Sequence, residues 1–357
     1  MWWNRHRTEL KSLSLWQKNN VDFFQCHQDL PGSKLLVCAQ SNSATNLLAT
    51  RLGTLLGTHH IARLVSKTVM KRKKKEPNTL LREMMTDSVE KIALQRYRIV
   101  VTTLSLSAHL SCLGLGYFNR LFIDEASQAS EPEVLVTLNI VDPAGCKVVI
   151  AGDPFQLGPV VKSKEAEVMG MGVSMLERLM TCTIYNDKPR DLRLITKLVQ
   201  NYRSHKKLIA IPSKLFYEGE LEACSDKLDV SARGVLRLLP WAPTSSFPLM
   251  WHDVRSPHKK GSNNNPQATS LVNEKELEIV MRYVKRLMDG PTPALSVSPG
   301  SIGIVTPYKA QAAEIRRYLN MWTRRAQDIL VGTTEKFQVG VEREKSIKLK
   351  IAAEEEP

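Results

Sequence analysis

RLFIDEAS at residues 120–127 is followed further along the chain by AGDPFQLGP at residues 151–159. The first stretch is an apolar run of strand length that ends in acidic side chains, and the second closes a separate apolar run and carries Asp153 and Gln156. Because the carboxyl ends of parallel strands meet at one edge of a sheet, where such sheets bind ligands, we expect these polar ends to lie together. The pair therefore predicts an α/β fold with a ligand site at the edge of a parallel sheet.

Asp124 and Glu125 have the chemistry of a metal-bound phosphate site. In phosphoryl-transfer proteins a strand-end Asp holds Mg²⁺, and a neighbouring Glu can orient and deprotonate the attacking water. The alternative is an acidic turn after a strand, which is common. Gln156 favours the first interpretation, because a glutamine there can hydrogen-bond the γ-phosphate of a nucleotide. Its own alternative is an ordinary Gly-Asp-Pro turn.

Further apolar runs of strand length stand at residues 34–40, 98–105 and 146–153. Helical stretches separate them. The helical stretch after residues 34–40 has leucines at helical spacing and Ser43 as its expected N-cap. Residues 173–180 are expected to form another helix. Strands that are apolar throughout and alternate with helices predict a parallel sheet covered on both faces.

Residues 59–97 are interpreted as a basic insert, which contains the run KRKKK at residues 71–75. We favour a solvated loop for this run, since charge runs usually lie in solvent. Two functional alternatives are additional phosphate contacts, each weakening with salt, and a nuclear-localisation patch.

A second block of the same kind begins near residue 191. Residues 247–254 are expected to form a strand and residues 255–272 a loop. A strongly amphipathic helix follows, in which Asn273 and Glu276 resemble a capping box. Later expected elements are a strand at residues 301–308, a helix at residues 309–319 and a strand beginning within residues 328–338. The rest of the chain is charged, and no further buried strand is predicted there.

The composition favours a polyanionic partner. The chain has 357 residues, a formal net charge of +14 and six cysteines. This charge indicates nucleic acid or an acidic membrane surface, the alternative being a basic protein with no such partner. The cysteines form no Cys-x-x-Cys pair, which predicts a reducing, intracellular chain without a zinc site. No secretory signal is expected, and no apolar stretch approaches the length that spans a membrane.

NYRSHKKL at residues 201–208 adds a third motif. Arg203 has the chemistry of an arginine finger supplied by the same chain, and the ring of Tyr202 can stack on a base. The alternative is the basic start of a surface helix.

Seven stretches carry a resemblance to a known family: CAQSNSATNLL, VVTTL, FIDEASQASEPE, IAGDPFQLGPVVKS, SMLERLM, LVQNYRSHKKLIAIPSKLFYEGELEAC and GIVTPYKAQ. In this order they resemble the up-frameshift-type branch of the superfamily 1 helicases and, within it, the Armitage-type (Moloney-leukaemia-virus-ten-like) RNA helicases of RNA silencing. The resemblance implies two RecA-like (P-loop NTPase) α/β domains with parallel sheets, at residues 33–190 and 191–338. An unassigned segment, 1–32, precedes them and a charged tail, 339–357, follows.

The resemblance also implies roles for single residues. Asp124 and Glu125 correspond to the family's magnesium and water-activating pair, and Gln156 to its γ-phosphate sensor. Tyr202 and Arg203 correspond to the base-stacking and phosphate-contacting pair of the second domain. Hydroxyl and amide contacts to phosphates position a strand without reading its sequence. The residues implied to make them are Ser41, Asn42, Ser43, Thr102, Thr103, Thr306, Pro307 and Tyr308.

The same resemblance implies a function. It is that of an ATP-dependent RNA helicase that uses ATP and Mg²⁺ to translocate on single-stranded RNA, in RNA-mediated gene silencing. Single-stranded RNA or an RNA duplex is the implied partner, together with Argonaute-type silencing proteins. A cytoplasmic location, ribonucleoprotein granules included, follows from the resemblance. DNA stays open as the strand that is tracked.

Three departures from the family's pattern bear on this. The chain has no G-x-x-x-x-G-K-[ST] loop to cradle phosphates; PGSK at residues 31–34 is a superficial echo that precedes a strand. Residues 337–342 carry one residue more than the family's corresponding motif, and its final Arg-bearing motif does not follow. We therefore expect a truncated form with weak ATP binding and two incomplete sheets, the first lacking a central strand. The alternatives are a catalytically inactive RNA-binding or scaffold protein and a non-functional fragment.

Overall fold

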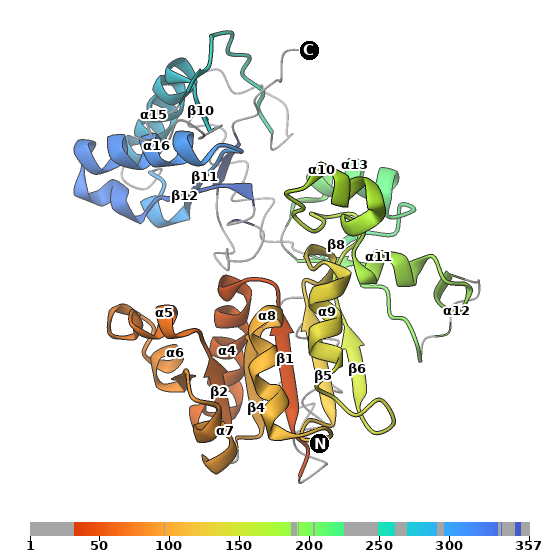
Figure 1. Cartoon of the computed structure of the whole chain (residues 1–357). Helices are drawn as coiled ribbons and strands as arrows, with labels where there is room; N and C mark the ends of the chain where they lie inside the picture. Colours follow the sequence, from red (N-terminus) through yellow and green to blue (C-terminus); the bar gives the residue numbers. More distant parts are fainter. Residues whose placement is uncertain are drawn as a thin grey trace. The chain divides into compact units, whose positions relative to one another are not determined.

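The computed structural model describes residues 32–95, 97–186, 191, 193–202, 204–224, 249–260, 270–290, 296–334, 337 and 347–350 (Figure 1). The chain separates into two compact units, Met1–Lys197 and Leu198–Pro357. Each unit has its own parallel sheet and its own hydrophobic core.

A six-stranded sheet of order β3-β2-β4-β1-β5-β6 forms the centre of the first unit. Every pairing between neighbouring strands is parallel. The parallel sheet and the strands predicted from the four apolar runs are therefore confirmed. The strands are β1 (Leu35–Ala39), β2 (Ile61–Leu64), β3 (Met85–Thr86), β4 (Ile99–Thr103), β5 (Arg120–Asp124) and β6 (Lys147–Ile150).

Helices cover both faces of this sheet, as the continuous apolar strands predicted. α4 (Asn42–Leu56) packs against β1, β2 and β4. On the other face α8 (Leu104–Ser107) packs on β1 and β4 and against α9 (Glu131–Leu138). Successive residues of a strand point to opposite faces. Leu36 and Cys38 accordingly join the core on the side of α8 and α9.

The region predicted as a basic insert, residues 59–97, is instead part of the sheet. It contributes β2, which lies between β4 and β3, and β3 itself. All four residues of β2 are buried, including Arg63, whose charge interrupts the apolar run and hides the strand from a search by pattern. Within the lysine run, Lys73 donates to the carbonyl oxygen of Met85 (2.7 Å), while its neighbours in the run are exposed.

β6 lies at one edge of the described sheet. Its two valines point to opposite faces, and Val148 is 41% and Val149 51% exposed, so neither face is well covered at this strand. The strands from β3 to β6 are hydrogen-bonded without interruption. The described sheet therefore has no gap at its centre, contrary to expectation, and a further strand can pair with it only at an edge.

A three-stranded sheet of order β12-β11-β13 forms the centre of the second unit. Helices α15 (Glu274–Asp289) and α16 (Lys309–Trp322) share a buried core with it. Asn273 is the N-cap of α15, since its side chain accepts a hydrogen bond from the Glu276 amide (3.1 Å). The reciprocal bond of the predicted capping box is replaced, because the Asn273 amide donates to Oε1 of Gln311 (2.8 Å). The strands are β11 (Ile302–Val305), β12 (Leu330–Gly332) and β13 (Ile347–Lys350).

Three predictions for this unit are wrong. Residues 249–254, the described part of the strand predicted at 247–254, form no strand. Within the predicted loop at residues 255–272, β9 (Lys259–Lys260) and β10 (Leu271–Val272) pair antiparallel. The predicted charged tail contributes β13, which pairs with β11. Its sequence, Ile-Lys-Leu-Lys, alternates apolar and charged residues, which is typical of a strand with one apolar side.

Candidate functional site

The two motifs that decide the fold lie side by side at the carboxyl edge of the first sheet. β5 and β6 are neighbouring parallel strands, as predicted. The Ala151 amide donates to the carbonyl oxygen of Ile123 (2.8 Å), and the Ala126 amide donates to that of Ala151 (2.9 Å). These bonds tie the Asp-Glu-Ala-Ser turn to the Gly-Asp turn that follows β6.

Gly152 allows this close approach. A Cβ atom at this position would lie 3.0 Å from the amide nitrogens of Ala126 and Ser127 and 2.8 Å from Cδ2 of Leu176. Two of these neighbours are backbone atoms, which cannot move without shifting the turn. The glycine of the Gly-Asp motif is therefore required by packing between the two motifs.

Glu125 adopts a left-handed backbone conformation, with φ 54° and ψ 38°. This conformation is unfavourable for an L-residue by about 1–2 kcal/mol. Local bonds hold the turn, since the Glu125 amide donates to Oδ1 of Asp124 (3.0 Å) and Gln128 Nε2 donates to Oε2 of Glu125 (3.0 Å). Backbone strain of this kind is concentrated at functional sites. Gln128 lies within the quoted family stretch, yet sequence reasoning gave it no role.

Burial of the carboxyl group, reinforced by the nearby charge of Glu125, raises the pKa of Asp124 to about 7. The hydrogen bond from the Glu125 amide and the charge of Arg51 act in the opposite direction. A bound divalent cation would favour the ionised form, because an opposite charge lowers a carboxyl pKa. Carboxylate oxygens are also the ligands that Mg²⁺ prefers. The donor set at the end of β5 thus fits magnesium, with Asp124 as the residue that would hold it.

Gln156 is engaged by its own turn. Its side-chain amide donates to Oδ2 of Asp153 (2.7 Å), and the Phe155 amide donates to Oδ1 of the same carboxylate (3.1 Å). Asp153 therefore organises the Gly-Asp-Pro-Phe-Gln turn. The residue predicted to sense a γ-phosphate is exposed at the sheet edge and would have to exchange this bond for a phosphate oxygen.

The segments predicted to contact RNA in the first unit lie at the carboxyl ends of β1 and β4. β1 lies between β4 and β5, and its last residue, Ala39, is paired with Thr103 on one side and Asp124 on the other. The turn after β1 and the end of β4 therefore share an edge with the acidic pair. Adjacent strands are about 4.8 Å apart, so these groups are close neighbours.

Ser41, not Ser43, is the N-cap of α4. Its hydroxyl accepts a hydrogen bond from the Ala44 amide (3.1 Å), and its backbone is extended. Asn42 and Ser43 form the exposed first turn of the helix. Helix starts leave backbone amides without helical partners and carry the positive end of the helix dipole, both of which favour phosphate.

Thr102 has a different position from the one expected of an RNA contact. It is fully buried, and its hydroxyl donates to the carbonyl oxygen of Leu64 (3.2 Å). Its side chain is therefore part of the framework beneath the edge, whereas Thr103 is half-buried at the edge itself. The sequence could not separate the two threonines, because the alternation of the strand decides which one faces inward.

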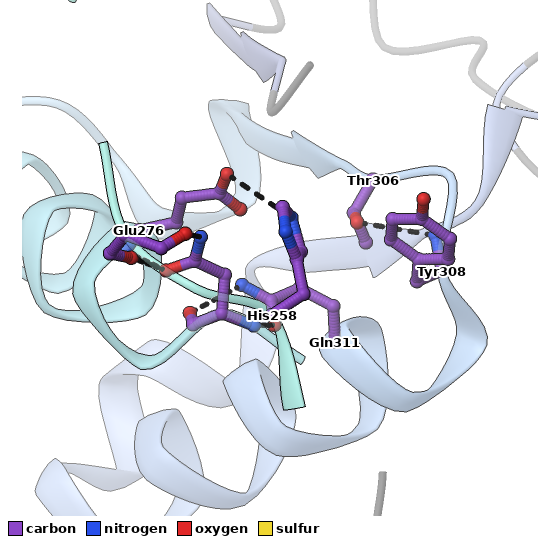
Figure 2. A network of polar contacts seen from close by, with 7 residues as sticks. His258, Glu276, Thr306, Tyr308 and Gln311 are labelled. Carbon is purple, nitrogen blue, oxygen red and sulfur yellow. Dashed lines mark hydrogen bonds and ion pairs between the residues drawn. The ribbon is translucent and has the colours of Figure 1, made fainter. Parts of the chain in front are cut away.

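In the second unit the predicted segment Thr306–Pro307–Tyr308 joins a polar network (Figure 2). Thr306 is buried, and its hydroxyl accepts from the Tyr308 amide (3.3 Å), so it shapes the turn. Gln311 is also buried and bonds both the amide (2.8 Å) and the carbonyl oxygen (3.0 Å) of Asn273. Pro307 is exposed and Tyr308 half-buried, which leaves these two at the surface.

His258 and Glu276 complete this network. The His258 ring meets the Tyr308 ring edge-on, with centroids 6.3 Å apart, and His258 Nε2 lies 4.0 Å from a carboxylate oxygen of Glu276. Burial raises the pKa of Glu276, and the charge of His258 opposes that rise. Neither residue carries a sequence signal for this role, since the contact joins a loop to a helix start.

The third motif is described only in part. Tyr202 is half-buried, and its hydroxyl donates to Oε1 of Gln200 (2.6 Å). Arg203, the predicted arginine finger, lies outside the described residues. Its role and that of Tyr202 stay predictions.

No group of three or more His, Cys, Asp or Glu side chains in the described part of the chain is arranged to hold a metal ion. Among the helices described, none is long and apolar enough to cross a membrane.

Comparison with known proteins points to one family. Two family models, each described as an AAA domain, match residues 58–164 and 171–347. RNA helicase Mov10l1 of Mus musculus is 37% identical over 339 residues, which is 88% of this chain and 26% of that protein. Putative helicase MOV-10 of Gallus gallus is 34% identical over 348 residues, covering 90% of this chain and 35% of that protein.

Putative helicase mov-10-B.1 of Danio rerio is 34% identical over 342 residues, 89% of this chain and 32% of that protein. The chain thus spans about a quarter to a third of the length of these relatives. The match to residues 58–164 contains both strand-end motifs, Asp124-Glu125 and Gly152-Asp153. With its parallel sheet and paired strand-end motifs, the chain belongs to the up-frameshift-type superfamily 1 helicases.

Proposed function

We propose that this chain forms the motor region of an ATP-dependent RNA helicase that translocates on single-stranded RNA in RNA-mediated gene silencing. The observation that carries the proposal is the alignment of strand ends in the first sheet. It brings the acidic pair Asp124 and Glu125 within one strand of the exposed helix start at Asn42 and Ser43. A hydrolytic centre and a phosphate-tracking surface at one sheet edge suit a nucleic-acid motor.

Each residue at the sheet edge would have a separate role in ATP hydrolysis or RNA binding. Asp124 would hold magnesium, which when bound neutralises charge on the nucleotide phosphates. Glu125 would accept the proton of the attacking water, and Gln128 holds its carboxylate in place. Gln156 would bond the γ-phosphate. The backbone amides at the start of α4 and the hydroxyl of Ser43 would bond RNA phosphates without reading sequence.

A second candidate is an RNA-binding or scaffold protein without ATPase activity. The absence of G-x-x-x-x-G-K-[ST] from the sequence favours it, because that loop supplies much of the affinity for nucleotide phosphates. Under this candidate the acidic pair is retained but has no tightly held phosphate to act on. Both candidates would share Argonaute-type partner proteins and a cytoplasmic site of action. These two proposals rest only on the resemblance to the family.

ATP hydrolysis and RNA binding, measured on the same purified chain, separate the candidates. We expect single-stranded RNA to stimulate phosphate release and Glu125→Gln to abolish that stimulation. Glu90→Gln is the matched control, since Glu90 is exposed at the start of a distant helix. RNA binding without ATP turnover would establish the second candidate. Absence of RNA binding would contradict both.

A further inference from the structure

Arg63 is a fully buried charge in the first unit. It has no exposed surface, although it stands in the middle of β2. Burial lowers the pKa of Arg63 to about 10, so the guanidinium is charged at pH 7. No carboxylate of the described residues forms an ion pair with it. Burying a charge without a counter-ion costs folding free energy, so a functional reason for a charged residue at this position is expected.

The guanidinium donates two hydrogen bonds to side chains in the first two turns of α4. Its Nε donates to Oδ1 of Asn46 (3.0 Å), and its Nη2 donates to Oδ1 of Asn42 (2.9 Å). The two asparagines are four residues apart, so they share one face of the helix. Arg63 thereby clips the start of α4 onto the sheet.

The hydrogen bond from Arg63 also sets the orientation of the Asn42 side-chain amide. An arginine can only donate, so the side-chain oxygen of Asn42 must face it. The NH₂ group of Asn42 is then left as a donor at the exposed helix start, and no described residue accepts from it. A donor fixed by a rigid partner loses less freedom on binding than a rotating one.

Arg63 connects this surface to the predicted RNA contact that is buried. Its Nη1 donates to the carbonyl oxygen of Leu64, which also accepts the hydroxyl of Thr102. The buried threonine at the end of β4 and the exposed asparagine at the start of α4 are thus held through one side chain and one carbonyl group.

We propose that Arg63 is a positioning residue for RNA: it holds the NH₂ group of Asn42 outward to donate to a backbone phosphate and places an uncompensated positive charge beneath that contact. The inference rests on the proposed RNA binding. It adds a residue that does not itself touch the strand.

A double-mutant cycle on RNA affinity tests this. The variants are Arg63→Met, Asn42→Ala and the two combined, with the dissociation constant for a labelled single-stranded RNA measured well below each melting temperature. We expect each single change to weaken binding about tenfold, the value of one charge-assisted bond. We expect the double variant to be no weaker than the worse single one, because both remove the same contact. Thr54→Ala, at the far end of α4, is the control.

A purely structural role for Arg63 makes different predictions. Folded Arg63→Met that binds RNA as tightly as the unaltered chain overturns the proposal, and so does full additivity in the cycle. Should Arg63→Met fail to fold, Asn42→Asp replaces it. The carboxylate still accepts from Arg63 but cannot donate, so the melting temperature should hold or rise while RNA binding weakens about tenfold or more.

Asn42→Asp that binds RNA normally likewise overturns the proposal. An unaltered chain that binds no RNA overturns the proposed function first, and the inference with it. The two failures are therefore distinguishable from the affinity of the unaltered chain.

Discussion

Replacing Gly152 by alanine tests whether the two motifs at the sheet edge are packed as described. The added methyl group would meet two backbone amide nitrogens at 3.0 Å and a leucine methyl at 2.8 Å. Overpacking of this kind costs about 1–3 kcal/mol. Replacement of a glycine also stabilises a protein by about 0.4–1 kcal/mol through the unfolded chain, which partly masks the clash.

Gly158→Ala removes that ambiguity, because its added methyl would have only one neighbour, a carbonyl oxygen at an ordinary 3.7 Å. Both variants share the unfolded-state gain, so the difference between them isolates the clash. We expect the free energy of unfolding of Gly152→Ala to be lower by about 1–3 kcal/mol than that of Gly158→Ala. In a unit of this size this corresponds to a melting temperature lower by about 2–12 °C.

The assay is thermal unfolding followed by circular dichroism, with RNA-stimulated phosphate release measured alongside. The displaced turn should reduce phosphate release in Gly152→Ala and leave it unchanged in Gly158→Ala. Equal melting temperatures for the two variants would refute the packing argument, since both are Gly→Ala changes and only the clash distinguishes them.

Three further predictions concern other parts of the site. Glu125→Gly should keep or slightly raise the melting temperature, because it relieves the left-handed strain, yet it should abolish RNA-stimulated phosphate release. Ser41→Ala should lower the free energy of unfolding by about 1 kcal/mol and Ser43→Ala by less than about 0.5 kcal/mol, because only the first is the N-cap; the reverse order in a denaturant titration would contradict the cap. Glu276→Gln should raise the melting temperature at pH 8, where burial disfavours the charged carboxylate. The gain should vanish below the ordinary pKa of 4.5, where folded and unfolded chains are both protonated; a gain that persists at pH 4 would show another cause.

The strands predicted correctly were those that are apolar throughout. β1, β4 and β5 lie in the interior of the sheet and β6 at its edge, and all four are predicted from their own sequences without knowledge of neighbouring elements. β2 was missed because Arg63 interrupts its apolar run. The charge is accommodated there because Asn42 and Asn46, distant in sequence, and the Leu64 carbonyl oxygen accept hydrogen bonds from it. Composition cannot reveal such a tertiary bond.

In the candidate site too, some features were predictable from the sequence and others depend on tertiary contacts. The meeting of Asp124 with the Gly-Asp turn followed from the rule that parallel strand ends share an edge, and it is confirmed. The difference in burial between Thr102 and Thr103 was not predicted, because it depends on where β4 ends and on the bond from Thr102 to the Leu64 carbonyl oxygen. Likewise Ser41 and Ser43 are chemically equal as caps, and only the backbone conformation distinguishes them.

The pairing of Ala39 with both Thr103 and Asp124 has a mechanical consequence. A single strand, β1, separates the proposed hydrolytic carboxylates from the proposed RNA track, and neighbouring strands are about 4.8 Å apart. A change at the proposed magnesium site would therefore reach the proposed RNA surface across one strand, without a relay of distant side chains. The turn after β1 and the carboxylates at the end of β5 are held by the same strand pairing, so a substitution that distorts this pairing should weaken both proposed activities together.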